Sequence, residues 1–155
     1  MEERVKEAMR SSMMDLLRDM MTTRRGSLDE KDLKWLRSLL EEMRSRVLSL
    51  TPRRMDLHAT FCNGFDVDLM VQMLSRDAMD DTEFAKMGCF LMDRLGLLCA
   101  PSQDEEVKLV RYKLLSGSLD FASLLFKAHS IIDEIENLSQ SDESKRVREA
   151  VRKKC

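Results

Sequence analysis

Apolar residues recur at spacings of three and four along most of the chain. Since an α-helix turns once in about 3.6 residues, this spacing places them on one face of a helix. The first such run is Val5, Met9, Met13, Leu16, Leu17 and Met20. Runs of the same period predict six more helices, over about 27–47, 52–62, 66–74, 80–98, 102–115 and 118–138. No segment alternates apolar and polar residues between hairpin turns. The pattern therefore predicts an all-α fold of about seven helices, either a compact multi-helix bundle or an irregular antiparallel helical array.

Residues that favour helix starts and stops stand between these runs. Ser27 with Glu30, and Ser102 with Glu105, have the spacing of a capping box, in which each side chain bonds a free backbone N–H of the first turn. Proline suits a first turn because its missing N–H would be unpaired there. The other predicted starts are Thr51-Pro52, Asp66, Asp80 or Asp81, and Ser118, and the predicted stops include Gly26, Gly64, Cys99 before Pro101, and Gly117.

The length of 155 residues fits a single domain. We divide it into an N-terminal amphipathic helix at 1–26, a helical core at 27–140 and a charged C-terminal segment at 141–155. The helix between Phe84 and Leu98 is the most apolar, and we expect it to lie at the centre.

Charge and cysteine content restrict the functional class. The formal net charge of -2 argues against a chain built to bind nucleic acid. The cysteines form no C-x-x-C pair, the first ten residues are highly charged, and no stretch approaches the roughly 18 apolar residues of a membrane span. We therefore expect an intracellular, cytoplasmic protein with free thiols and no transmembrane segment.

Residues suited to chemistry are sparse. His58 and Cys62 could share a helix face, but zinc needs at least three protein ligands. The aspartates at 66 and 68 begin like a calcium loop that lacks its glycine and its final glutamate. Phosphate-binding loops and nucleophile elbows are missing. We expect no catalytic residues, no metal site and no cofactor.

Protein binding has better candidates, because the chain contains 13 methionines. Methionine adapts to irregular surroundings, so these residues either fill the core or line a groove for a partner helix. Charges of both signs on the first helix favour packing on protein over lying on a membrane. Six basic residues near the C-terminus fit either an acidic partner or a solvated helix end. Our candidate partner-binding residues are Met70, Met73, Met87, Asp104 and Glu105.

Three segments resemble a known family. Residues 98–107 read L-C-A-P-S-Q-D-E-E-V and resemble the L-C-A-P-x-R-D-E-x-V signature of the T-complex protein 11 family. Residues 65–74, followed by the A-M-D at 78–80, resemble its D-x-D-L-I-x-Q-Q-L stretch and the A-L-D after it. Residues 39–52 read L-L-E-E-M-R-S-R-V-L-S-L-T-P and resemble the family segment L-L-x-x-x-x-x-x-L-x-S-L-x-P. The chain departs at Gln103, where the family has arginine, and at Arg76-Asp77, where a glycine is more usual.

The resemblance covers roughly residues 37–138 and implies a helical protein without a known catalytic site. Family members are usually longer, so the chain resembles the N-terminal part of the domain or a short member. The family is linked to sperm function, flagellar partners and cAMP-dependent signalling. We therefore predict a non-catalytic protein-binding adaptor or scaffold, with the flagellum or cytoskeleton as further locations. The alternatives are a structural component of an axonemal or cytoskeletal assembly, and an enzyme of unfamiliar type. The partner proteins and the oligomeric state stay open.

Overall fold

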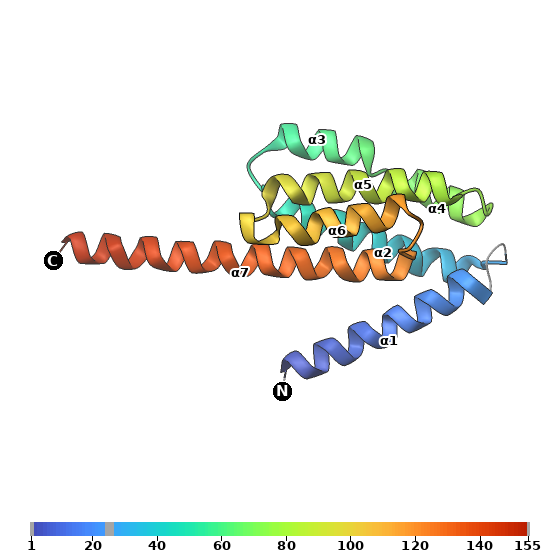
Figure 1. Ribbon diagram of the computed structural model, residues 1–155, viewed down its shortest axis with the longest axis horizontal. Helices are drawn as coiled ribbons and strands as arrows, with labels where there is room; N and C mark the ends of the chain where they lie inside the picture. The colour runs from blue at the N-terminus through green and yellow to red at the C-terminus, as the bar shows by residue number, and fades with distance from the viewer. Residues whose placement is uncertain (1, 24–26, 155) are drawn as a thin grey trace.

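The computed structural model describes the backbone of residues 2–23 and 27–154 and the side chains of residues 4–22 and 27–137. Within these residues the chain is helical and has no strand (Figure 1). This confirms the predicted all-α array. The elements are α1 (Glu2–Thr23), α2 (Glu30–Ser49), α3 (Met55–Gly64), α4 (Val67–Ser75), α5 (Asp81–Leu98), the short 3-10 turn η1 (Pro101–Gln103), α6 (Asp104–Leu115) and α7 (Phe121–Lys154).

Helix α5 lies at the centre of the array, as expected, although α4 is the more apolar helix. It packs against α3, α6 and α7, while α2 packs against α3, α4 and α7. Helix α1 packs against α7, and Figure 1 shows it diverging from the other helices toward the N-terminus. The last part of α7 extends beyond the body of the array.

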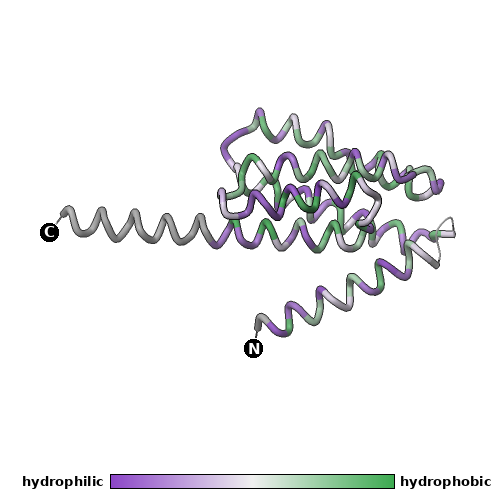
Figure 2. Tube along the Cα trace, viewed as in Figure 1, coloured by the Kyte–Doolittle hydropathy of each residue, from purple (hydrophilic) through white to green (hydrophobic). Residues whose placement is uncertain are grey.

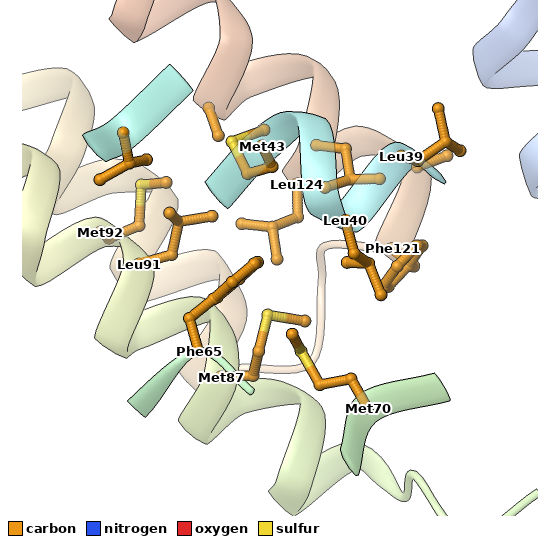
Figure 3. Packing of buried hydrophobic residues seen from close by; sticks show 14 of the residues in the cluster. Leu39, Leu40, Met43, Phe65, Met70, Met87, Leu91, Met92, Phe121 and Leu124 are labelled. Atoms are coloured by element: carbon orange, nitrogen blue, oxygen red, sulfur yellow. The ribbon is translucent and has the colours of Figure 1, made fainter. Parts of the chain in front are cut away.

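One cluster of buried side chains holds these helices together. Along most helices apolar and polar residues alternate with the turn of the helix, so each has an apolar side to bury (Figure 2). Figure 3 shows leucine, methionine and phenylalanine side chains from α2, α4, α5 and α7 meeting in the interior. Leu17 and Met20 of α1 belong to the same cluster. The N-terminal helix therefore shares one core with the described side chains that follow it, residues 27–137.

Two predicted helix starts were wrong because stronger capping groups lie nearby. Helix α2 is capped by Asp29, whose Oδ1 accepts from the Asp32 N–H at 2.9 Å, and Asp32 Oδ2 accepts from the Asp29 N–H at 3.2 Å. These carboxylates form the capping box expected of Ser27, and their charge suits the positive end of the helix dipole. Similarly, α7 begins at Phe121, because Asp120 Oδ1 accepts from the Ser123 N–H at 2.8 Å.

The third predicted start was also wrong, because Thr51-Pro52 forms a turn before α3. The Arg54 N–H donates to the Thr51 carbonyl at 3.2 Å. The His58 ring nitrogen Nε2 lies 2.7 Å from the same carbonyl and 3.1 Å from that of Leu48. The Leu48 carbonyl in the last turn of α2 and the Thr51 carbonyl just after it are thus satisfied by the turn and by a side chain of α3.

The aspartate caps of α4 and α5 are confirmed. Asp66 Oδ1 accepts from the Leu69 N–H at 3.2 Å, and Asp80 Oδ1 accepts from the Glu83 N–H at 2.8 Å. Helix α6 ends before Gly117, whose φ of 74° is the left-handed conformation that glycine adopts most easily. Helix α7 continues through residues 140 and 141, so the boundary expected there falls inside one helix.

Asp77, between α4 and α5, has the left-handed φ of 50°, at the place where the resembling family more often has glycine. The Ala78 N–H donates to the Met73 carbonyl at 2.8 Å and closes the end of α4. A Cβ atom is costly in this conformation. We expect Asp77→Gly to be more stable than Asp77→Ala by about 1 kcal/mol. Both variants lack the carboxylate, so their difference in urea unfolding isolates the backbone effect. Equal stabilities would contradict it.

None of the helices in the described residues combines the length and apolar composition that crossing a bilayer requires.

Candidate protein-binding surface

Helix α1 carries apolar side chains around a wider part of its circumference than the part that packs into the core. Leu17 and Met20 are only 3% and 4% exposed and pack into the core. Four other apolar residues follow one another along the helix at spacings of four and three and remain exposed. We call them the N-terminal stripe: Val5, Met9, Met13 and Leu16, with 56%, 61%, 38% and 63% exposed. The stripe is the longest row of exposed large apolar residues on any helix whose side chains the structure describes.

Ion pairs hold α1 antiparallel to α7. Arg10 Nη1 lies 2.6 Å from Asp133 Oδ2, and Arg18 Nε lies 2.7 Å from Asp120 Oδ2. Arg18 Nη2 also donates to Ser123 Oγ at 3.0 Å. These side chains remain partly exposed, so each pair contributes little to stability and mainly fixes how α1 lies on α7.

Arg46 of α2 joins this contact from the other side. Its Nη2 lies 2.7 Å from Asp133 Oδ1 and 3.3 Å from Glu136 Oε2, and its Nη1 lies 2.7 Å from His129 Nδ1. Because arginine only donates hydrogen bonds, Nδ1 must accept, and the His129 ring is neutral with its proton on Nε2. Burial raises the pKa of Asp133, but the hydrogen bonds from Arg10 and Arg46 outweigh it and lower that pKa overall.

The pKa of His129 is lowered, first by burial and then by the charge of Arg46. The unfolded chain therefore takes up a proton at this residue near the ordinary value of about 6.5, while the folded chain does not. Stability linked to His129 is present above that pH and is lost as the pH falls, by at most about 1.4 kcal/mol per pH unit.

We expect His129→Gln to lose less stability than the unaltered chain between pH 7.5 and pH 5.5. The glutamine oxygen can still accept from Arg46 but does not titrate. Carboxyl groups with a lowered pKa, such as Asp133, protonate in the unfolded chain only near pH 4, below this window. Urea unfolding of both proteins at the two pH values measures the difference, and an identical pH dependence would refute the role of His129.

A groove lies beside this ion-pair network, between α1, α2 and α7. Its volume is about 130 Å³. Met13 lines it and also belongs to the N-terminal stripe, so the two features are continuous. We call it the α1–α2–α7 groove, and its lining residues are Arg10, Met13, Met14, Leu17, Leu39, Glu42, Arg46, Ala122, Leu125, Phe126 and His129.

The methionines proposed from the sequence lie elsewhere. Met70 and Met87 are 5% and 8% exposed and point into the core from α4 and α5 (Figure 3). Met73 is half-buried against the same core. Two of these three methionines therefore stabilise the fold, and a partner can reach only Met73 without unfolding it.

The acidic pair Asp104 and Glu105 is exposed in the first turn of α6. The Asp104 carboxylate lies 3.6 Å from Lys108 Nζ, one turn further along the helix. About 16 Å of helix lie between Met87 and the end of α5 at Leu98, and the acidic pair follows after η1. Partner binding by Met73, Asp104 or Glu105 stays a prediction.

The N-terminal stripe and the groove were missed by sequence reasoning. The periodicity of α1 was interpreted as one apolar helix face, although Met14 and Met21 extend the apolar residues around the helix beyond that run. An apolar arc wider than one packing face indicates a second contact surface. That signal was present in the sequence.

The L-C-A-P segment forms a structural corner. Gln103 is 3% exposed, and its Oε1 accepts from the Ala100 N–H at 3.0 Å. Its Nε2 donates to the Ile131 carbonyl at 3.3 Å and to Glu134 Oε2 at 3.1 Å. The capping box expected of Ser102 and Glu105 is therefore wrong, because the Gln103 side chain folds back over the turn instead. The Gln103 side chain thus ties η1 to α7.

Groups of residues suited to metal binding are not found among the described side chains, where no three histidines, cysteines or carboxylates come together. The described cysteines Cys62, Cys89 and Cys99 are free thiols. The lowered pKa values of Asp133 and His129 belong to the contact between α1, α2 and α7.

The fold and this surface define an all-α protein, a single helical array with an apolar helix face left uncovered. Compared with known protein families, residues 1–137 match the family described as T-complex protein 11. The chain belongs to the T-complex protein 11 family. No solved structure matches it.

Proposed function

We propose that this chain is a non-catalytic protein-binding adaptor or scaffold, and that the N-terminal stripe is its main contact surface. The exposure of Val5, Met9 and Leu16 on one side of α1 carries this proposal. Contiguous exposed apolar residues are costly in water, and on soluble proteins they mark interaction sites. The T-complex protein 11 family is not known for enzymatic activity, which agrees with a binding role.

Family membership alone supports the finer part of the proposal. It links the chain to cAMP-dependent signalling and to sperm function, with partners in the cytoplasm, the flagellum or the cytoskeleton. The partners we propose are other proteins, without a role for nucleic acid or a cofactor.

The proposal is tested by capturing partners with the full chain and with matched double variants. Met9→Glu with Leu16→Glu places two charges on the N-terminal stripe. Leu109→Glu with Leu115→Glu places the same charges on two exposed leucines of α6. Because a few central residues carry most of the binding energy of an interface, and a charge buried there is costly, we expect the α1 variant to lose partner capture at least about tenfold.

Co-purification from cells that express the chain, followed by quantitative mass spectrometry, measures the capture. Circular dichroism serves as the control that both variants keep the helical content of the unaltered chain. Equal capture by the unaltered chain and the α1 variant would remove the stripe from the proposal. Selective loss with the α6 variant would move the binding surface to α6.

A role as a structural component of an axonemal or cytoskeletal assembly is the second candidate, and the length of α7 favours it. This helix has 34 residues, about 51 Å at 1.5 Å per residue, and its backbone continues beyond the other helices (Figure 1). Such a projecting helix offers a second attachment point on a different side from α1. Recovery of the chain mainly in the cytoskeletal fraction would favour this role, and recovery in the soluble fraction would favour the adaptor.

A further inference from the structure

We propose that the α1–α2–α7 groove receives one large apolar side chain of a partner helix, and that a lysine or arginine beside this side chain pairs with Glu42. The inference rests on the proposed protein-binding function and deepens it, because it names the chemistry of the partner. It follows from the size of the groove, its charges and its continuity with the N-terminal stripe.

The size of the groove suits a single aliphatic or aromatic side chain. Its volume is about 130 Å³, and an apolar cavity of about 150 Å³ in another protein holds benzene. The walls are mainly apolar and come from three helices: Met13, Met14 and Leu17 from α1, Leu39 from α2, and Ala122, Leu125 and Phe126 from α7. Two of these lining residues are methionines, whose flexible thioethers adjust to the shape of a bound side chain.

The charges at the groove favour a cation. The guanidinium groups of Arg10 and Arg46 already pair with Asp133, and that of Arg46 also pairs with Glu136. The His129 ring accepts from Arg46 and is neutral. Glu42 is exposed, lines the groove, and forms no ion pair or hydrogen bond with the described side chains. The charge of Glu42 acts on Arg10 and His129, but among the charged lining residues only this carboxylate has no ion pair with a described side chain.

The N-terminal stripe determines the kind of partner. Met13 belongs to both the stripe and the groove, so a segment lying along Val5, Met9 and Leu16 can direct one side chain into the hollow. A partner helix presents apolar residues at spacings of three and four, which matches a row with the same spacings on α1. Since α1 is a helix and offers no free strand edge, the partner cannot bind by adding a strand.

The test uses displayed helical peptides and the full chain as bait. The library consists of 16-residue helix-forming peptides with leucine, phenylalanine or alanine at the anchor positions and lysine, glutamate or glutamine beside them. We expect selection for a large apolar anchor flanked by lysine. Glu42→Lys should weaken binding of the selected peptides at least tenfold and reverse the preference to glutamate. Glu41→Lys is the matched control, because this neighbouring carboxylate does not line the groove.

Methyl signals of the methionines show where the selected peptides bind. With 13C-labelled methionine methyls, we expect shifts at Met9, Met13 and Met14 and none at Met92 in the core. The inference is overturned if the library yields acidic peptides or no peptide at all. It is also overturned if Glu42→Lys leaves binding unchanged, or if only other methionines show shifts. Self-association of the chain through α1, detected by sedimentation, would overturn it in favour of a second copy.

The outcome is separable from that of the proposed function. If the stripe variant loses its cellular partner while Glu42→Lys keeps it, the adaptor role stands and the inference about the groove fails. If neither the stripe variant nor Glu42→Lys changes partner capture, the inference about the groove fails and the N-terminal stripe is removed from the proposed function.

Discussion

Replacing Met70 by glutamate is expected to abolish cooperative folding of the chain. The side chain is 5% exposed and belongs to the same buried cluster as Met87, Phe65 and Leu40 (Figure 3). A carboxylate there must either lose its hydration or take up a proton, and either change costs several kcal/mol. That cost is comparable with the whole stability of a domain, about 5–15 kcal/mol. Thermal melting followed by circular dichroism should show a much lower midpoint or no cooperative transition.

Neighbouring positions of α4 provide the matched controls. Leu69 is 52% exposed, so Leu69→Glu should melt within a few degrees of the unaltered chain. Met73→Glu should lie between the two, because this side chain is only half-buried. The sequence placed Met70 among the candidate partner-binding residues, an interpretation that requires a position at the surface. A normal melting curve for Met70→Glu would revive that interpretation and contradict the packing in Figure 3.

Helical periodicity predicted most of the fold because the residues that determine each helix lie within that helix or directly beside it. Each helix repeats its apolar residues within its own length, and the aspartates at 66 and 80 directly precede the helices they cap, each accepting from an N–H three residues on. The missed starts at Asp29 and Asp120 have a local cause too. Serine and aspartate both cap helices, and where they stand close together, spacing alone does not decide between them.

The candidate surface could not be predicted as readily, because it depends on contacts distant in the sequence. The side of α1 that packs is determined by pairs such as Arg10 with Asp133, which are 123 residues apart. A pattern of apolar residues on one helix shows how wide its apolar arc is but not which part of the arc a neighbour covers. For the same reason Met70 and Met87 could not be distinguished from surface methionines until α2, α4, α5 and α7 were placed together.

Phe61→Ala is the second substitution with a large expected effect, because Phe61 joins α3 to the rest of the array. The ring is fully buried, and its centroid lies 5.2 Å from that of Phe65 and 5.7 Å from that of Phe90 in α5. The guanidinium carbon of Arg94 lies 5.6 Å from the Phe61 centroid, and Arg94 Nη1 donates to the Leu57 carbonyl of α3 at 3.2 Å. Removing the ring leaves a cavity and ends both stacking contacts. We expect a loss of about 3–5 kcal/mol in the free energy of unfolding.

The effect should be concentrated in α3, which has only ten residues and few contacts outside this aromatic cluster. Phe61→Leu keeps much of the buried volume and should cost less than about 1.5 kcal/mol. Urea unfolding measures the loss of stability, and amide hydrogen exchange locates it. Exchange in Phe61→Ala should accelerate first at residues 57–64 of α3, because a segment with few buried contacts opens locally before the whole domain unfolds. Uniform acceleration through α5 and α7 would instead show that the Phe61 ring supports the entire core, and an unchanged α3 would contradict the stacking.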